Sequence, residues 1–454
     1  MQTLELRNKE VLVLGLGRSG MAAASLLQRD GARVVVRDEG YGEVLEDRAN
    51  RLRQLGVRVE LGTHFDVAQR FDLAVLSPGI APERPFVQEL VQRRTPVLSE
   101  LEIAYRHCLC PIVAITGTNG KTTTTELIAT ALESCDKRTV AAGNNGYAFC
   151  DAVEATAGLD ALVLETSSYQ LERIEQFRPT VAVLLNIHPD HMDRYPSLDD
   201  YAQAKARIFM NQTAEDTAVV SAEALPAVWR LAGKLKGRLI TFSAYNQPAD
   251  LWLDWVDADT IWCKLPECQG ILLRLSETHL RGAHNAENVL ATLATGMALG
   301  LPVRQMCEAI RGYCPQAHRC EFVAKIGGVT YINDSKATNV DAVHRALRAL
   351  PGRVLLIAGG RDKALDYSTL KEVIAEKVKL AVLIGEAQDK LCAAWDGAAP
   401  CVRADTLTEA VRLAASRARC GDTVLLSPAC ASFDMFDNYE HRGEVFKRAV
   451  FELW

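Results

Sequence analysis

The chain of 454 residues carries a formal net charge of −6, and 48% of its residues are hydrophobic. That length is too great for one core, so two or three soluble domains are expected, and the acidic balance argues against a nucleic-acid partner. No apolar run approaches the roughly 18 residues that span a membrane, and the polar start of the chain lacks a secretory signal. A cytoplasmic protein without a membrane partner is therefore expected, and thirteen cysteines without a repeating spacing indicate reduced thiols.

Residues 1–106 alternate short apolar runs with helical segments, which is typical of a parallel α/β domain. A GxGxxG sequence at residues 15–20 separates the first apolar run from the first helix, and Asp38 ends the next run about twenty residues later. Taken alone, this stretch favours a dinucleotide-binding oxidoreductase over other functions. The glycines themselves indicate only that a diphosphate can approach the backbone here. Ser77 follows a later apolar run, where a ligand contact and a plain turn both stay open.

The sequence ITGTNGKTTTT at residues 115–125 stands between an apolar run and an amphipathic helix, the context of a phosphate-binding loop. Gly117 and Gly120 would let backbone N–H groups face phosphate oxygens, and the helix start adds roughly half a positive charge. Lys121 would reach the outer phosphates, and the Thr122 hydroxyl would ligate Mg²⁺. Binding of a nucleoside triphosphate is the expectation on which the rest depends.

Polar residues follow the next apolar runs and would converge on the nucleotide, because the carboxyl ends of parallel strands share one edge of a sheet. Glu165 is the natural carboxylate for Mg²⁺, and a helix cap is the alternative. His188 and His191 form either a metal pair or a loop cap, and histidine is a poor ligand for a hard cation.

Lys205 lies four residues from both Tyr201 and Phe209, which puts it on an apolar helix face. A lysine there either extends its amine to solvent or has a depressed pKa and reacts as a neutral amine, for instance with carbon dioxide to give a carbamate. Both interpretations stay open.

A third α/β unit runs over residues 315–454, and three of its apolar runs end in clusters of small residues with a cation or hydroxyl. The clusters are NDSKATN at 333–339, GGRDK at 359–363 and SPACASFD at 427–434. Such clusters suit the capture of a carboxylate, although any one of them could be a solvated turn.

Eight motifs together resemble the Mur ligases of peptidoglycan synthesis, and among them the members that add D-glutamate. The motifs are TGTNGKTTTT, LETSSYQL, HPDHMDRY, YAQAKARIF, HNAENVLA, AHRCE, NDSKATN and SPACASFD. The resemblance covers the whole chain and implies a three-domain α/β fold. It has a Rossmann-like N-terminal domain over 1–106, a central P-loop ATPase-like domain over 107–314 and a C-terminal Rossmann-like domain over 315–454.

The resemblance implies that ATP, with Mg²⁺, phosphorylates the carboxylate of UDP-N-acetylmuramoyl-L-alanine and that the amine of D-glutamate attacks the acyl phosphate. The partners are then small molecules alone, and a monomer is expected. In the family the first domain binds the uridine nucleotide, so the dehydrogenase interpretation falls.

The resemblance also implies roles for individual residues. The expected catalytic residues are Lys121, Glu165, His191 and carbamylated Lys205. The expected metal ligands are Thr122, Glu165, His191 and Lys205. The expected ATP contacts are Gly117, Thr118, Asn119, Gly120, Lys121, Thr122, Thr123, Asn288, Arg319 and Asp334. The expected contacts of the uridine-diphosphate substrate are Gly17, Arg18, Ser19, Asp38, Glu39, Ser77 and Asn144. The expected D-glutamate contacts are Lys336, Thr338, Lys363, Ser432 and Tyr439.

Three rivals remain at this point. A ligase of the same superfamily could add another amino acid or extend a folate, but the DNPR-type motif of diamino-acid ligases is absent. An NAD-dependent oxidoreductase leaves the phosphate loop, Glu165 and Lys205 without a role. A nucleotide sensor without catalysis leaves the full set of candidate metal ligands unexplained.

Overall fold

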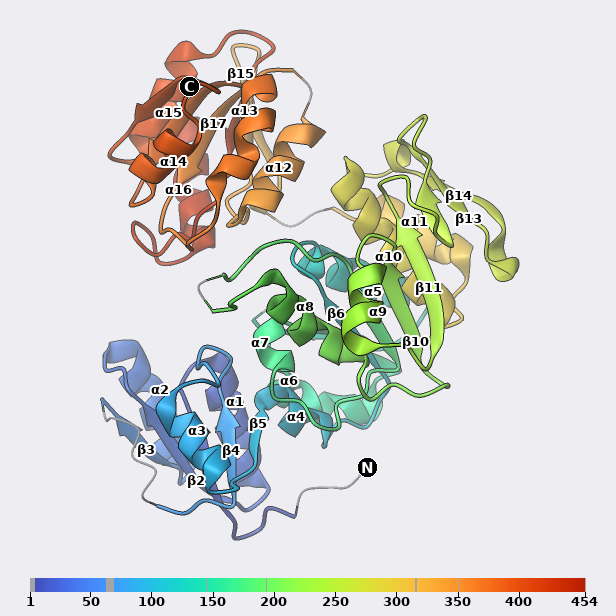
Figure 1. Cartoon of the computed structure of the whole chain (residues 1–454), viewed down its shortest axis with the longest axis vertical. Coiled ribbons are helices and arrows are strands. Elements are labelled where there is room, and N and C mark those ends of the chain that lie inside the picture. The colour runs from blue at the N-terminus through green and yellow to red at the C-terminus, as the bar shows by residue number, and fades with distance from the viewer. Residues whose placement is uncertain are drawn as a thin grey trace.

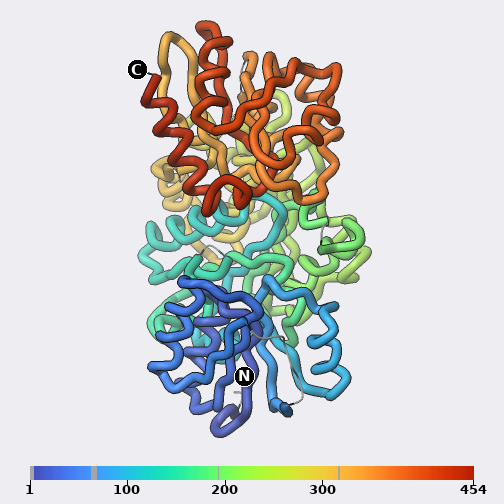
Figure 2. Tube along the Cα trace, turned by 90° about the vertical axis from the view of Figure 1, so that its left-hand side faces the viewer, coloured from blue at the N-terminus to red at the C-terminus, as the bar shows by residue number. Residues whose placement is uncertain are grey.

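The computed structural model describes residues 5–62, 69–144, 146–192, 194–314, 317–350 and 352–453. Three α/β units follow one another along the long axis of the molecule, and the central unit lies between the other two (Figures 1 and 2). Each unit is built on its own sheet, of five, nine and six strands. The expected three-domain α/β architecture is confirmed.

The first sheet is wholly parallel, in the order β3-β2-β1-β4-β5. This is the order of a Rossmann-like half-fold, in which the loop after β1 lies at the switch point. Its strands are β1 Glu10–Leu14, β2 Arg33–Asp38, β3 Arg58–Leu61, β4 Leu73–Leu76 and β5 Val97–Ser99. Its helices are α1 Arg18–Arg29, α2 Glu43–Gln54, α3 Pro85–Gln92 and α4 Glu100–Tyr105.

The central sheet has the order β14-β13-β12-β11-β10-β9-β6-β8-β7, and only β13 and β14 run antiparallel to their neighbours. Its middle strands are buried on both faces, which explains their continuous apolar sequence. The strands are β6 Ile112–Thr116, β7 Thr139–Gly143, β8 Ala161–Glu165, β9 Val181–Leu184, β10 Thr217–Ser221, β11 Arg238–Ser243, β12 Leu251–Leu253, β13 Thr260–Cys263 and β14 Gly270–Arg274. The helices are α5 Lys121–Ser134, α6 Phe149–Ala152, α7 Ser168–Leu171, α8 Leu198–Ala206, α9 Leu225–Ala232, α10 Ala283–Ala298 and α11 Val303–Gly312.

The third sheet has the order β15-β16-β20-β17-β18-β19, with an antiparallel hairpin at one edge and parallel strands elsewhere. Its strands are β15 Glu321–Ile326, β16 Val329–Asn333, β17 Val354–Gly359, β18 Val378–Ile384, β19 Cys401–Arg403 and β20 Thr423–Leu426. Its helices are α12 Val340–Ala349, α13 Lys371–Lys377, α14 Gln388–Ala394, α15 Leu407–Arg417 and α16 Tyr439–Phe451.

The hydrophobic cores join the three units unequally. One continuous core runs from the first sheet through α4 into the central sheet. The third sheet has a separate apolar core on each of its faces, and neither includes a residue of the central unit. The first unit is therefore fixed to the central one by apolar packing, whereas the third meets it through the polar contacts described below.

The domain boundaries at 106/107 and 314/315 stay a prediction, and residues 1, 315 and 454 lie outside the described residues. Among the helices that the structure describes, none has the length and apolar character needed to cross a bilayer.

Glu102 on α4 ties the first unit to the central one. Its buried carboxylate accepts hydrogen bonds from the backbone of Glu175, Gln176 and Phe177 at 2.9–3.0 Å and pairs with Arg106 at 2.9 Å. Removing the charge leaves the buried Arg106 with only the exposed Glu175 as an ion-pair partner, which costs about 3 kcal/mol. Glu102→Gln should therefore lower the melting temperature by roughly 6–10 °C in scanning calorimetry.

The matched control is Glu175→Gln, because Glu175 pairs with the same arginine but is 57% exposed. That variant should melt within about 2 °C of the wild type. Equal melting temperatures for the two variants would contradict the tethering role of Glu102.

Candidate active site

The loop between β6 and α5 has the form of an anion site. Gly117 has φ 155° and Gly120 has φ 87°, and a Cβ on Gly120 would come within 2.2 Å of the Asn288 side-chain oxygen. Only glycine fits that backbone, which delivers the loop directly into the start of α5. Gly120 is the N-cap of α5 and supplies no side-chain cap, so the first N–H groups of the helix stay available to a phosphate.

Two lysines donate to one carbonyl oxygen of this loop. Lys121 Nζ lies 2.9 Å from Gly117 O, and Lys205 Nζ lies 2.8 Å from the same oxygen. Lys205 is 1% exposed, so the interpretation in which its amine extends to solvent is wrong. Burial, followed by the charge of Lys121, holds the pKa of Lys205 well below its usual value, which favours a neutral amine.

Glu165 ends β8, the strand that pairs with β6 directly before the loop. It is buried, and its Oε1 accepts a hydrogen bond from Asn144 Nδ2 at 2.9 Å. Its Oε2 is buried without a hydrogen-bond partner in the part of the chain that the structure describes. The capping interpretation is wrong, because Ser167 caps α7. An unpartnered carboxylate oxygen beside a phosphate loop fits a hard divalent cation.

His191 and Asp190 follow β9 and face the same space. Burial lowers the pKa of His191 to about 4, so its ring is neutral near pH 7. Burial raises the pKa of Asp190, but Lys363 and His191 outweigh it, and the net pKa is lowered. His188 instead contacts Arg345 at 2.7 Å, so the two histidines have different neighbours. Within the described ranges no three His, Cys, Asp or Glu side chains form a metal cluster of their own.

The third unit brings cations onto the phosphate loop. Lys336 Nζ lies 3.4 Å from Thr122 Oγ1, and Lys363 Nζ lies 3.5 Å from Asp190 Oδ1. The Asn339 side chain donates to Asp190 Oδ2 at 3.2 Å. These contacts enclose a cavity of about 390 Å³. The sequence-predicted residues that line it are Arg18, Thr118, Asn119, Gly120, Lys121, Thr122, Asn144, Glu165, His191, Arg319, Lys336, Thr338, Lys363 and Tyr439.

A smaller cavity of about 100 Å³ lies at the side of the loop that faces α10. The sequence-predicted residues Thr123, Asn288 and Asp334 line it together with Asn119, Gly120, Arg319 and Lys336 from the larger space. Burial raises the pKa of Asp334 to about 7, although Ser427 Oγ donates to it at 2.9 Å. The two cavities share the loop, so an elongated anionic molecule could reach both.

The first-unit residues are less uniform. Of the six predicted substrate contacts in the first unit, Arg18 alone is among the residues that line the larger cavity. Asp38 accepts from Leu16 N at 2.6 Å, and Ser77 Oγ donates to Gly15 O at 3.0 Å, so both brace the glycine turn. Glu39 pairs with Arg84 at 2.6 Å. A Cβ on Gly17 would meet open space, and Ser19 lies in the first turn of α1.

Three further predicted residues do not line these cavities. Gly117 belongs to the phosphate loop itself, and Lys205 donates to its carbonyl oxygen through the hydrogen bond given above. Ser432 is buried next to the bridge between Arg361 and Ala431. Sequence reasoning also left Asp190, Asn339, Gly146 and Glu440 without a role, although all four line the larger cavity. For Asp190 the signal was present, since it is an acidic residue directly before His191 at a strand end.

Family models match most of the chain. The model described as "Mur ligase MurD-like, N-terminal domain" matches residues 9–99. "Mur ligase middle domain" matches residues 115–296, and "Mur ligase, glutamate ligase domain" matches residues 318–430.

Curated relatives match over nearly the full length. The UDP-N-acetylmuramoylalanine–D-glutamate ligase of Acidobacterium capsulatum is 44% identical over 98% of this chain and 97% of the relative. The protein of the same name from Koribacter versatilis is 41% identical over 98% of both chains.

Solved structures share the fold at low identity. The MurF ligase from Thermotoga maritima in complex with ADP aligns with a TM-score of 0.63 at 17% identity, covering 100% of this chain and 97% of that one. A pseudomurein peptide ligase type C from Methanothermus fervidus aligns with the same TM-score and identity, covering 98% and 100%.

Proposed function

The chain belongs to the Mur ligase family, and from that membership we propose that it joins D-glutamate to UDP-N-acetylmuramoyl-L-alanine in an ATP-dependent, amide-forming reaction of peptidoglycan synthesis. The observation that carries the proposal is the 390 Å³ cavity, where the phosphate loop, the unpartnered Glu165 oxygen and cations of the third unit meet. An oxidoreductase would need none of these three features. The activity carried by the relatives' names supports D-glutamate as the amino acid.

Each unit would supply one reactant. The glycine turn after β1 would hold the uridine diphosphate, and Arg18 and Asn144 would direct the muramoyl-alanine carboxylate into the cavity. The phosphate loop would hold the triphosphate, with the nucleoside in the smaller cavity beside Asn288 and Asp334. Lys336, Thr338, Lys363, Ser432 and Tyr439 would receive D-glutamate. The boundaries 1–106, 107–314 and 315–454 are proposed for these three domains.

The reaction would then proceed in two steps. A carboxylate oxygen of the alanyl end attacks the γ-phosphorus of ATP, and ADP leaves. The amine nitrogen of D-glutamate attacks the acyl carbon, phosphate leaves, and the nitrogen loses its extra proton. Negative charge accumulates on phosphoryl and carbonyl oxygens in both steps, so Lys121, Lys336 and Arg319 would stabilise the transition states from fixed positions.

The residues present fit Mg²⁺, because Thr122 and Glu165 place oxygen ligands beside the phosphate loop. When bound, Mg²⁺ would offset the charge of the phosphate oxygens. His191 and Lys205 would complete a second position. For that role the neutral Lys205 amine would attack the carbon of CO₂, forming an N–C bond and releasing one proton. The resulting carbamate supplies the anionic oxygens that a hard cation prefers.

The experiment that tests the function is phosphate release with ATP, Mg²⁺ and UDP-N-acetylmuramoyl-L-alanine. D-glutamate is supplied, omitted, or replaced by L-glutamate, lysine or diaminopimelate. Release that needs both substrates and only D-glutamate is the expected result. Release with another amino acid would support the ligase reaction but contradict the specificity for D-glutamate. No release with any amino acid would contradict the proposed function.

Nucleotide affinity should depend on pH through Asp334. Its carboxyl group would accept hydrogen bonds from the ribose much more strongly when ionised, and burial raises its pKa to about 7. The affinity for a non-hydrolysable ATP analogue should thus rise with pH up to about 7 and level off above, by at most about tenfold per pH unit. Calorimetric titration of wild type and Asp334→Asn at pH 5.5–8.5 checks this. The phosphate groups of the ligand titrate equally in both experiments, so the ratio of the two affinities reports the effect of Asp334 alone. A constant wild-type to variant affinity ratio would contradict the role of Asp334.

A further inference from the structure

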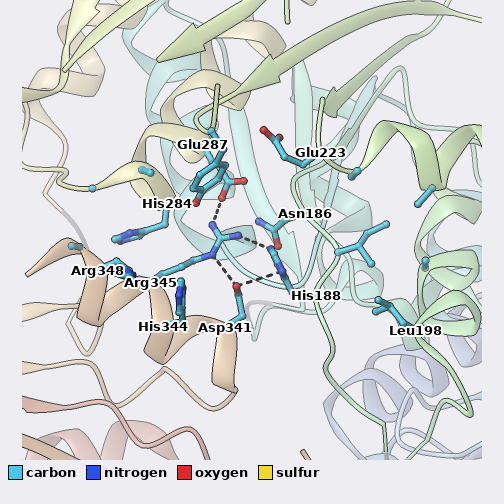
Figure 3. Close-up of a pocket in the computed structure, with 18 of the residues that line it drawn as sticks. Asn186, His188, Leu198, Glu223, His284, Glu287, Asp341, His344, Arg345 and Arg348 are labelled. Atoms are coloured by element: carbon cyan, nitrogen blue, oxygen red, sulfur yellow. Dashed lines mark hydrogen bonds and ion pairs between the residues drawn. The ribbon is translucent and has the colours of Figure 1, made fainter. Parts of the chain in front are cut away.

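A third cavity lies outside the two already discussed and is larger than both of them. It has a volume of about 520 Å³ and lies between the central unit and α12 of the third unit (Figure 3). Of the residues considered from the sequence as possible ligands, His188 alone lines it, and none of the residues given a role in the reaction does. It touches the smaller nucleotide cavity only through His284 and Arg345, which line both.

The floor of this cavity is an ion-paired cluster centred on Arg345. The guanidinium donates to Glu287 of α10, to Asp341 at 2.8 Å and to His188 Nε2 at 2.7 Å, as the dashed lines of Figure 3 show. Because His188 Nε2 accepts from an arginine, the His188 proton lies on Nδ1, 3.4 Å from Asp341. Every charged group in the cluster is therefore already paired within the protein, and none needs a ligand to neutralise it.

The walls of the cavity differ in character. One wall is apolar, with Leu198 and Ala202 of α8 and Ala224 and Ala227 at the start of α9. Two imidazoles, His284 and His344, line the cavity on the side away from Leu198 (Figure 3). Neither imidazole has a hydrogen-bond partner among the residues that the structure describes, and burial lowers the pKa of both, so both are neutral near pH 7.

The lining does not favour an anion. Three arginines and four carboxylic acids line the cavity, so positive groups do not outnumber negative ones. Each of the arginines is already paired with an acid. A neutral imidazole offers one donor, one acceptor and a flat ring face. Two such rings opposite an apolar wall suit a flat ring with hydrogen-bonding edges, in the way that ligand pockets combine apolar walls with a few polar groups.

We propose that this cavity is a second ligand site, separate from the reaction cavity, for an uncharged planar heteroaromatic molecule of nucleoside size. Such a ligand would contact the central unit and α12 together. Its binding would reach the phosphate loop, because Asp341 Oδ2 accepts both from Arg345 and from Asn119 of that loop, the latter at 2.7 Å. The site is thereby coupled to nucleotide binding, and the coupling is reciprocal.

The test uses the full chain and adenosine as the probe. Adenosine is titrated calorimetrically into protein saturated with AMP-PNP and Mg²⁺, so that the nucleotide site is filled. The variant Ala227→Trp puts a large ring into the cavity from the apolar wall, and Ala232→Trp puts the same ring on the exposed end of the same helix as the control. Neither residue belongs to the proposed reaction machinery.

We expect one adenosine per chain in the wild type and in Ala232→Trp, at least tenfold weaker binding in Ala227→Trp, and weaker binding of adenosine 5′-monophosphate than of adenosine. The AMP-PNP affinity of Ala227→Trp without adenosine should stay within twofold of the wild type. No adenosine binding, or equal binding in the two variants, would overturn the site. A tenfold loss of AMP-PNP affinity in Ala227→Trp would show that the cavity belongs to the ATP site and would also overturn the proposal. Because every readout is binding, failure of the ligase assay is a separate outcome.

Discussion

Replacement of Lys205 by alanine or by arginine is expected to abolish amide formation, with kcat lower by at least about 10³-fold. The amine is buried against Gly117 O, and both its burial and the neighbouring Lys121 disfavour the charged form. Arginine keeps a positive charge but cannot react with carbon dioxide, so it would fail as completely as alanine. A purely structural role for the cation would instead let arginine retain much of the activity.

Chemical rescue separates the carbamate from other roles of Lys205. Formate or acetate should restore part of the activity of Lys205→Ala, because a free carboxylate can replace the carbamate oxygens, and should not stimulate the wild type. Protein equilibrated with ¹³C-bicarbonate should show a carbamate carbon resonance that is absent from Lys205→Ala. The exposed residue Lys234 supplies the control, since Lys234→Ala should keep full activity. Near-wild-type turnover by either Lys205 variant would refute the carbamate.

The sequence allowed the interior of the fold to be predicted well. The runs that became β6, β8 and β9 are apolar throughout because these strands are buried on both faces. Most strands that were not identified are short or lie at sheet edges; the exception is β10, which is buried and lies between β9 and β11 inside the central sheet. β19 has three residues that are half-buried or exposed, and β15 alternates partly buried and exposed positions in an edge hairpin. Such strands carry little hydrophobic pattern, so periodicity does not reveal them.

Some residues of the candidate sites could likewise be predicted from the sequence, and others could not. The phosphate loop, Glu165 and Lys205 were found because each breaks a local rule, as a glycine turn, a buried carboxylate or a lysine on an apolar face. The cluster around Arg345 gave no such signal. Its partners Glu287 and His188 are separated from it by 58 and 157 residues, and each alone is an ordinary helix or loop residue. Only the docking of α12 on the central unit brings them together.

The change Glu165→Gln is expected to raise the Mg²⁺ concentration needed for half-maximal rate by more than tenfold and to lower kcat/KM by about 10²–10³-fold. Glutamine has nearly the same shape, and its oxygen can still accept from Asn144 Nδ2, so the variant removes the charge and the unpartnered oxygen alone. Initial rates over a Mg²⁺ series measure the first effect. Binding of Mn²⁺ to the enzyme with AMP-PNP, followed by electron paramagnetic resonance, gives a readout that does not depend on turnover.

The control for Glu165→Gln is Glu133→Gln, which removes an exposed carboxylate from the far end of α5, the helix that the phosphate loop opens. It should leave the rate, the Mg²⁺ dependence and the Mn²⁺ binding unchanged. If Glu165→Gln loses activity while its Mn²⁺ affinity stays at the wild-type level, the negative charge of Glu165 matters for the reaction but not for holding the metal. In that case the unpartnered Oε2 would need another partner, and the candidate cations are Lys121 and Lys336, which both interact electrostatically with Glu165. A loss of both activity and metal affinity is the result that the buried, unpartnered oxygen leads us to expect.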